Sequence, residues 1–125
     1  ILRTAGEVVW FDDEARLDAV TAVSASGPAY VFYFIEALAR AGTELGLSAE
    51  QARALAVQTF VGAAHLAAES TEPLQSLRER VTSKGGTTAA ALAWLDANAV
   101  EARIVEAVHA AYRRAAELGD EFGRQ

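Results

Sequence analysis

The sequence predicts an all-α fold, a helical bundle with long central helices, from three observations. Alanine is the commonest residue, and Leu, Glu and Arg are frequent; all four favour helices. Apolar residues recur every three or four positions over most of the chain, which is the spacing of one helix face. Only one short run, Val8 to Phe11, has the composition of a strand. Helices must therefore supply the core.

The composition limits the class of protein. The 125 residues suit one domain, 1–125, which buries roughly two-thirds of the surface that its unfolded chain exposes. A net charge of −6, with scattered basic residues, disfavours nucleic acid and anionic membranes as partners. No uninterrupted apolar run reaches the roughly 18 residues that span a bilayer, so we expect no membrane partner. The chain has no cysteine and so no disulfide and no thiolate metal site, which fits a cytoplasmic protein.

The chain contains no methionine and opens on Ile1. We therefore expect it to be a piece of a longer chain; a tag removed during preparation is the alternative. No G-x-G-x-x-G fingerprint of a dinucleotide-binding unit occurs in it.

Caps and turns divide the first part of the chain. Residues 1–11 form a short extended segment that leads into the first helix. One of two aspartates, Asp12 or Asp13, caps that helix, which runs to about Ser24. The stretch 24–28 breaks the helical pattern, and Pro28 suits the first turn of the next helix.

The helix from Pro28 to about Leu45 is apolar on nearly every side. Its polar residues form one narrow stripe at four-residue spacing, Glu36, Arg40 and Glu44. A helix that is apolar on most faces must be buried on most faces. This helix is therefore central, or shared with a second subunit.

Further helices follow at clear boundaries. Gly46 ends the second helix, and a capping-box pattern at Ser48–Gln51 starts the third. The remaining predicted spans are a third helix to about Ser70, then Leu74 to Val81, about Thr87 to Asp96, and about Val100 to Leu118, closed by Gly119.

Common catalytic motifs are absent, and His65 and His109 are isolated on helices between apolar neighbours, as structural or surface histidines are. Two segments stand apart. The first, Ser24–Tyr30, places small residues before a proline at a helix start, where another group can approach the backbone closely. An ordinary joint between two helices is an equally good interpretation of this segment.

The second segment, Val81–Thr88, combines hydroxyl residues, Lys84 and two glycines just before an alanine-rich helix. The glycines let backbone N–H groups turn toward one point, and the helix start adds unpaired N–H donors at the positive end of its dipole. This arrangement favours a site for a carboxylate or phosphate. A plain helix cap at Thr87 or Thr88 is the alternative.

In this order, the two segments resemble the C-terminal domain of pyrroline-5-carboxylate reductases. Ala25 stands where glycine is usual in that family, and Lys84 where proline is usual; neither change removes a side chain expected to do chemistry. The similar blocks cover nearly the whole chain: Asp18–Ser24, Ser26–Tyr30, Gln58-Thr59, Gly62–Ala64, Val81–Ser83 and Gly85–Thr88.

The resemblance implies an all-α fold like the C-terminal domain of 6-phosphogluconate dehydrogenase, with helices that intertwine in a homodimer; higher oligomers built from dimers also occur in the family. It implies a preceding dinucleotide-binding (Rossmann) domain, absent from this chain, that binds most of the NADPH or NADH. The implied reaction reduces 1-pyrroline-5-carboxylate to L-proline. We expect the isolated piece to be inactive.

The resemblance also implies roles for single residues. Thr88 is the catalytic residue, near the imine nitrogen. Backbone N–H groups around Gly86, Thr87 and Thr88 hold the substrate carboxylate, with support from the Ser83 hydroxyl and with Val81 beside them. The nicotinamide lies against four consecutive residues, Ser26, Gly27, Pro28 and Ala29. No residue is implied as a metal ligand.

Two other functions stay open. The chain could be a non-catalytic helical dimerisation module with a merely structural loop. It could also be the helical domain of another dehydrogenase with a Rossmann domain, such as a β-hydroxyacid dehydrogenase. Those enzymes commonly use a lysine on a central helix as the acid, whereas Lys84 lies in a predicted loop.

Overall fold

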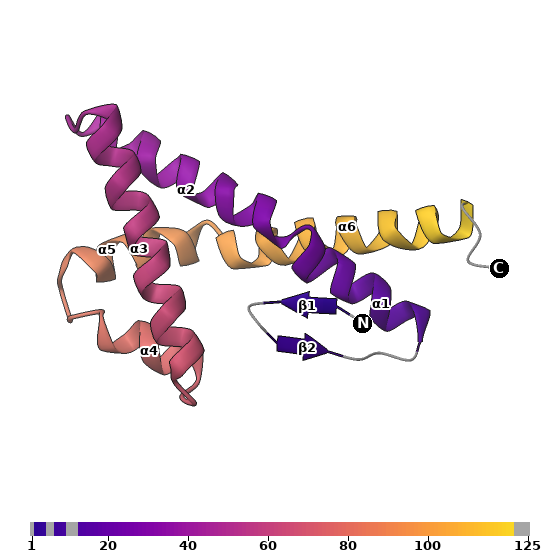
Figure 1. Ribbon diagram of the computed structural model, residues 1–125. Coiled ribbons are helices and arrows are strands. Elements are labelled where there is room, and N and C mark those ends of the chain that lie inside the picture. Colours follow the sequence, from indigo (N-terminus) through magenta and orange to yellow (C-terminus); the bar gives the residue numbers. More distant parts are fainter. Residues whose placement is uncertain (1, 5–6, 10–12, 122–125) are drawn as a thin grey trace. The chain divides into compact units, whose positions relative to one another are not determined.

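The computed structural model describes residues 2–4, 7–9 and 13–121, and within them the chain is helical apart from one small hairpin (Figure 1). The all-α prediction is confirmed. The chain divides into two compact units, one of residues 1–30 with 99–125 and one of residues 31–98. Helix α2 (Gly27–Glu44) begins in the first unit and continues into the second.

The first unit opens with the hairpin. Strands β1 (Leu2–Thr4) and β2 (Glu7–Val9) pair antiparallel, with Leu2 opposite Val9. The predicted extended segment 1–11 therefore contains two short paired strands. Trp10 and Phe11, the end of the strand-like run, lie outside the described residues.

Helix α1 (Glu14–Val20) begins where Asp13 caps it, as predicted for one of the two aspartates. The Arg16 backbone N–H donates to the Asp13 carboxylate over 2.8 Å. The predicted break at 24–28 is too wide, because only Ser26, a bend, separates two helical elements there. The chain continues from α1 into a π-helix, η1 (Thr21–Ala25), and then into α2. A π-helical turn absorbs one extra residue without leaving the helical path, which a break predicted from composition does not anticipate.

Helix α6 (Val100–Glu121) packs against α1 and η1 within the first unit. The predicted stop at Gly119 is wrong, because the helix runs on to Glu121. A glycine costs about 1 kcal/mol in a helix relative to alanine, and it ends a helix only where the backbone turns left-handed. Here the Arg114 guanidinium contacts Glu117 at 3.0 Å and Glu121 at 3.9 Å, and so bridges the glycine.

The second unit begins with the rest of α2, which turns sharply into α3 (Ala49–Glu69). The turn has the bonding of a Schellman motif: the Leu47 N–H donates to Gly42 O, and the N–H of Gly46, at φ +106°, donates to Thr43 O. The predicted capping box follows, since the side chains of Ser48 and Gln51 accept each other's backbone N–H.

Helices α2 and α3 approach each other at two places. A Cβ on Gly42 would lie 3.1 Å from the Cβ of Ala52, so the missing side chain lets the helices approach. Further along, the rings of Phe34 and Phe60 meet edge to face at 5.2 Å. Helices α4 (Leu74–Arg80) and α5 (Thr87–Ala97) complete the unit, each within one residue of its predicted bounds.

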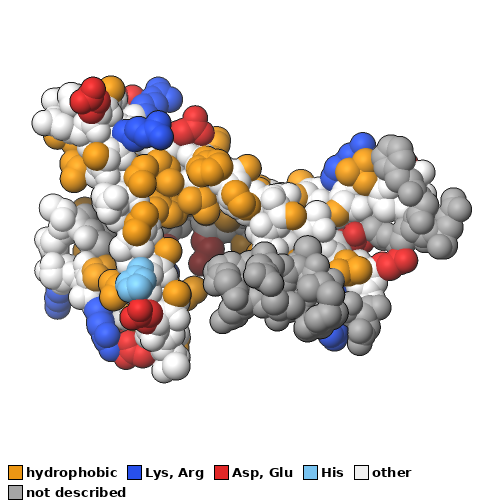
Figure 2. All heavy atoms as spheres, in the orientation of Figure 1, with side chains coloured by type: hydrophobic (Ala, Val, Ile, Leu, Met, Phe, Trp, Pro, Cys, Tyr) orange, Lys and Arg blue, Asp and Glu red, His pale blue; other side chains and the backbone are white. Residues whose placement is uncertain are grey.

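The buried core of one protomer is small. Within the described part of the chain, the buried hydrophobic residues are three alanines, Ala22, Ala52 and Ala56. The side chain of Phe32 is 63% exposed and that of Tyr33 is 77% exposed, although both lie on the most apolar helix. Hydrophobic side chains are visible along α2 in Figure 2.

The continuous helical stretch Glu14–Glu44 is long and apolar enough, by length and composition alone, to cross a membrane, and little of it is buried in the protomer. Polar residues such as Thr21, Ser24 and Ser26 interrupt its apolar runs, so no single run is long enough to indicate a span. The structure joins α1, η1 and α2 into one helical path, and this path has no charged residue between Asp18 and Glu36.

Candidate functional site

Residues 81–86 form the loop between α4 and α5. Backbone N–H groups at the start of this loop donate to carbonyls in the last turn of α4. The Val81 N–H donates to Arg78 O over 3.3 Å, and the Thr82 N–H donates to Glu79 O over 3.1 Å. The Thr82 hydroxyl also donates to Arg78 O, over 2.7 Å. Thr82 therefore caps the end of α4, and its hydroxyl proton is not available to a ligand.

A tight turn over Ser83–Gly86 forms the rest of the loop. The Gly86 N–H donates to the Ser83 carbonyl over 3.1 Å, and Gly85 at the third position has φ +74°. A positive φ at that position is the mark of a type II turn, which explains a glycine there. Lys84 holds the second position, where proline is common in such turns.

Gly86 permits a close approach of the Ser83 side chain. A Cβ built on Gly86 would stand 2.6 Å from the Ser83 Oγ, inside contact distance. The absence of a side chain thus lets the Ser83 hydroxyl lie against the residue that caps α5. The loop places one hydroxyl beside the positive end of that helix.

The first turn of α5 supplies the free donors. Within the described part of the chain, the N–H groups of Thr87, Thr88 and Ala89 donate no hydrogen bond. The same holds for the hydroxyls of Ser83, Thr87 and Thr88 among the described residues. Thr88 is half-buried, whereas Ser83 and Thr87 are exposed.

These donors change one detail of the predicted site. The Gly86 N–H, expected as part of the carboxylate grip, is already engaged with Ser83 O. Because Gly86 has no side chain, it leaves room for the Ser83 hydroxyl beside the start of α5. The Ala89 N–H is a further unpaired donor of this first turn, in line with the unpaired N–H donors expected at a helix start.

The predicted residue Val81 lies on the other side of the loop. It lines an apolar hollow of about 590 Å³ within the second unit, together with residues of α2, α3 and α4. Phe34, Leu38, Phe60, Leu66 and Leu77 are also in its wall. The side chain of Val81 is 68% exposed, so its placement fits packing against a further apolar surface.

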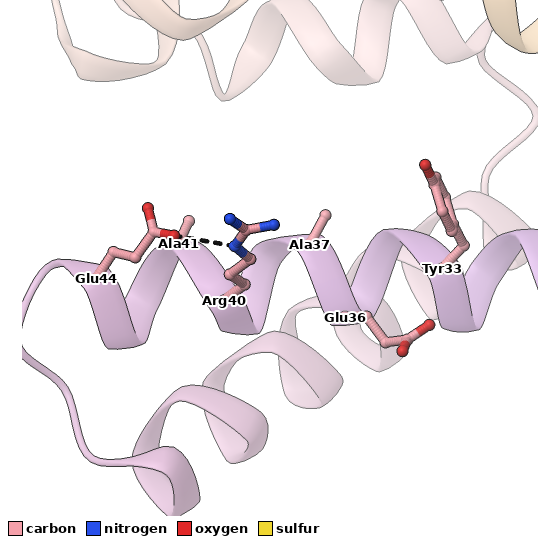
Figure 3. Close-up of a pocket in the computed structure, with 6 residues that line it drawn as sticks. All are labelled: Tyr33, Glu36, Ala37, Arg40, Ala41 and Glu44. Atoms are coloured by element: carbon pink, nitrogen blue, oxygen red, sulfur yellow. Dashed lines mark hydrogen bonds and ion pairs between the residues drawn. The ribbon is translucent and has the colours of Figure 1, made fainter.

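A second hollow, of about 490 Å³, lies along α2 alone (Figure 3). The polar stripe predicted for this helix lines it, and Arg40 Nε donates to Glu44 Oε2 over 2.9 Å. Tyr33 stands upright at one end of the stripe in Figure 3. A surface of this kind, with one charged pair between apolar flanks, is suited to contact with another polypeptide.

The second predicted segment, Ser26–Ala29, belongs to the first unit. It is the junction of η1 and α2, where Ser26 is the last cap of η1 and Pro28 is the second residue of α2. The Ser26 N–H donates to Thr21 O over 3.0 Å, and the Ala29 N–H donates to Ser26 O over 3.1 Å. We call Ser26–Ala29 the η1–α2 junction.

The surface of the η1–α2 junction is open. A Cβ added to Gly27 would meet no atom within 4 Å, and Pro28 and Ala29 are exposed. The fold of the protomer therefore does not require a glycine at position 27. An open glycine beside a proline at a helix start fits a surface that a flat ring can approach.

The two histidines have the surface positions predicted for them. His65 Nε2 lies 3.0 Å from Glu69 Oε1, and its side chain is 67% exposed. His109 is exposed on α6. The only lysine of the sequence, Lys84, lies in the α4–α5 loop, so no helix carries the lysine acid expected of a β-hydroxyacid dehydrogenase.

The comparison with protein families matches residues 14–118 to a model described as pyrroline-5-carboxylate reductase dimerisation. The fold and this match define the class as an all-α dimerisation domain of a reductase. Because the match covers most of the sequence, the chain belongs to the pyrroline-5-carboxylate reductase family.

Named relatives agree with this assignment. The chain is 48% identical over 124 residues to the pyrroline-5-carboxylate reductase of Pseudomonas aeruginosa, covering 99% of this chain and 45% of that protein. It is 45% identical over 106 residues to the enzyme of Arabidopsis thaliana, covering 85% of this chain and 38% of that protein. The chain thus spans less than half the length of these relatives.

Solved structures of the family superpose closely. A pyrroline-5-carboxylate reductase from Coxiella burnetii matches with a TM-score of 0.86 at 42% identity, over 90% of this chain and 42% of the other. The Plasmodium falciparum pyrroline carboxylate reductase, solved with NADP bound, matches with a TM-score of 0.82 at 38% identity, over 86% of this chain and 41% of the other. The predicted resemblance is confirmed.

Proposed function

We propose that this chain is the dimerisation and substrate-binding part of a cytoplasmic NAD(P)H-dependent reductase that converts 1-pyrroline-5-carboxylate to L-proline. In this proposal 1–125 is one domain, which works with a dinucleotide-binding domain of the same protein. The observation that carries the proposal is the set of unpaired donors at the α4–α5 loop. Three N–H groups and the Ser83 hydroxyl meet at the start of α5, in a chain of this family.

The substrate carboxylate binds at the start of α5. The N–H groups of Thr87, Thr88 and Ala89 donate to it, and the positive end of the helix dipole favours its charge. The Ser83 hydroxyl adds a further donor, held close by the missing side chain of Gly86. Val81 contributes through packing at the base of the loop.

The half-buried Thr88 takes the position next to the imine nitrogen. Its hydroxyl donates a hydrogen bond to that nitrogen and relays a proton from water, since a threonine hydroxyl is too weak an acid to give up its own proton. The product nitrogen thus gains one proton. Anchoring the carboxylate on the same helix turn orients the C=N bond, which is the main contribution of this chain to the rate.

The η1–α2 junction forms the cofactor-binding surface of the first unit. Its open surface at Gly27, Pro28 and Ala29 fits one face of a nicotinamide ring, with the Ser26 hydroxyl at the edge. When bound, the reduced nicotinamide supplies the hydride that adds to the imine carbon. A metal has no role in the proposal.

A second copy of this chain covers the exposed apolar face of α2. The protomer leaves Phe32, Tyr33 and Phe34 between 47% and 77% exposed, which is far from the burial that large apolar side chains reach in a folded protein. A bilayer is the less suitable environment, because Glu36, Arg40 and Glu44 continue along the same helix. The family model, a dimerisation domain, supports the protein partner. Higher assemblies of such dimers are compatible with this surface.

The test uses the full-length protein that contains this chain. With NADPH and 1-pyrroline-5-carboxylate, we expect reductase activity, and we expect Thr88→Ala to lower kcat/KM by about tenfold or more through loss of a hydrogen bond to the reacting group. Thr87→Ala is the matched control, because it keeps the backbone donors and changes a neighbouring, exposed hydroxyl.

A Thr88→Ala enzyme whose kcat/KM stays within about twofold of wild type would contradict the role of Thr88. An inactive full-length protein that still forms dimers would favour the non-catalytic dimerisation module. A crystal of the full-length protein soaked in proline separates the same two readings, since an empty α4–α5 loop at high proline argues against a substrate site.

A further inference from the structure

Two irregularities of the helical backbone occur at the η1–α2 junction. Before it, η1 has the long hydrogen bonds of a π-helix, such as Ser26 N–H to Thr21 O at 3.0 Å. Within it, Pro28 has no N–H, so it leaves one carbonyl of the preceding turn without a helical donor. A helix with such a joint bends more easily than a regular one.

One side chain ties the two sides of the joint together. The Tyr30 hydroxyl, one residue after the junction, donates to the Ala22 carbonyl over 2.8 Å. This bond spans eight residues, is partly buried, and encloses the whole junction between its two ends. The Ser24 hydroxyl donates to Val20 O over 3.0 Å and so pairs another carbonyl of the same region.

The acceptor end of the tie is fixed. Ala22 is only 1% exposed, and η1 packs against both α1 and α6. The Tyr30 bond thus connects the first turns of α2 to the core of the first unit. Without the hydroxyl, Ala22 O would lose this partner in a partly buried place, where an unpaired carbonyl is unfavourable.

We propose that Tyr30 is a positioning residue that holds the η1–α2 junction in the orientation needed for the nicotinamide. This inference rests on the proposed function of the junction as the cofactor-binding surface of the first unit. Tyr30 acts through the backbone of Ser26–Ala29 and does not touch the reacting atoms. Its hydroxyl fixes the angle between η1 and α2, and with it the orientation of the ring, on which hydride transfer depends strongly.

The experiment compares Tyr30→Phe with wild type in the full-length enzyme. The KM for NADPH should rise about five- to tenfold, as expected for one lost hydrogen bond, while the KM for 1-pyrroline-5-carboxylate stays within about twofold. NADPH binding, followed by nicotinamide fluorescence, should weaken by the same factor. Tyr112→Phe is the matched control: Tyr112 is a half-buried tyrosine of the same unit, and among the described residues its hydroxyl makes no hydrogen bond.

Two results would overturn the positioning role. Tyr30→Phe could match Tyr112→Phe in both KM values, or it could raise both KM values in parallel together with a lower Tm, which marks a general loss of structure. The fluorescence titration decides the question even if the enzyme has no reductase activity. Failure of the proposed function, seen as an inactive wild type, is thereby distinguished from failure of this inference.

Discussion

The α4–α5 loop and the η1–α2 junction are held in place by different kinds of bonding. The loop is fixed by its own backbone: a turn closed by Gly86 N–H to Ser83 O, with Gly85 at positive φ. The junction is fixed from outside, by the Tyr30 side chain that reaches back to Ala22. A backbone turn presents donors at set positions and suits a small anion, whereas a tied joint sets the angle of an open face and suits a flat ring.

The loop and the junction each contain a glycine, and the space around these two glycines differs. A Cβ on Gly86 would collide with the Ser83 Oγ at 2.6 Å, whereas a Cβ on Gly27 would meet nothing within 4 Å. The first glycine is needed to keep the Ser83 hydroxyl in its observed position. The second is needed only if a ligand or partner approaches it.

The largest effect is expected for Gly86→Ala. The Ser83 side chain is short and can rotate away, so the fold should survive, but the displaced hydroxyl no longer reaches the carboxylate. We expect the KM for 1-pyrroline-5-carboxylate to rise about 10- to 100-fold, the cost of a lost hydrogen bond to a charged group. Steady-state kinetics of the full-length enzyme measure this change.

A double-mutant cycle controls that prediction. Ser83→Ala alone should raise the KM by a similar factor and change kcat less, and the pair Ser83→Ala with Gly86→Ala should be no worse than either single variant. Additive losses would show that Gly86 acts through something other than the Ser83 hydroxyl.

A smaller effect is expected for Gly27→Ala, which should maintain or raise the stability of the fold and weaken the binding of NADPH. Gly27 is the first residue of α2, and replacing glycine by alanine in a helix stabilises it by about 0.5–1 kcal/mol. We expect an unchanged or higher Tm together with a KM for NADPH that rises about fivefold, because the methyl group occupies the open surface. An unchanged KM for NADPH would remove Gly27 from the proposed cofactor-binding surface.

The smallest effect is expected for Lys84→Pro. Lys84 is at the second position of the Ser83–Gly86 turn, its N–H donates no hydrogen bond among the described residues, and proline fixes φ at the value such a turn uses. The free energy of unfolding should increase by about 0.4–1 kcal/mol, measured by denaturant titration, with kcat/KM nearly unchanged. Lys84→Ala serves as the control for loss of charge, and a destabilised proline variant would contradict the type II assignment.

The helix caps and several helix boundaries could be predicted from the sequence, because hydrogen bonds between near neighbours determine them. The Asp13 cap, the Ser48 capping box and the left-handed Gly46 each satisfy backbone groups within a few residues, so their patterns are visible in the chain itself. The start of α5 after the glycine pair was predictable for the same reason.

Features that depend on contacts between residues several positions apart were not predictable from the sequence. The composition of the stretch before Pro28 indicated a break, but hydrogen bonds such as Ser26 to Thr21 keep it helical as η1. Gly119 suggested a stop, yet the contact between Arg114 and Glu121 lies across it. The engagement of the Gly86 N–H follows from the turn and not from residue type. The same limit applies to the Tyr30 tie, which joins residues eight apart.

The small core of the protomer has a consequence for how this protein reaches its native state. The buried apolar residues of the described chain are alanines, which contribute little hydrophobic free energy, while the large side chains of α2 stay uncovered until the proposed partner arrives. Folding and association then become a single bimolecular process, and the melting temperature depends on protein concentration. In a cell, a newly made chain competes with proteases until it meets a second copy, so the level of expression itself sets how much of the protein survives.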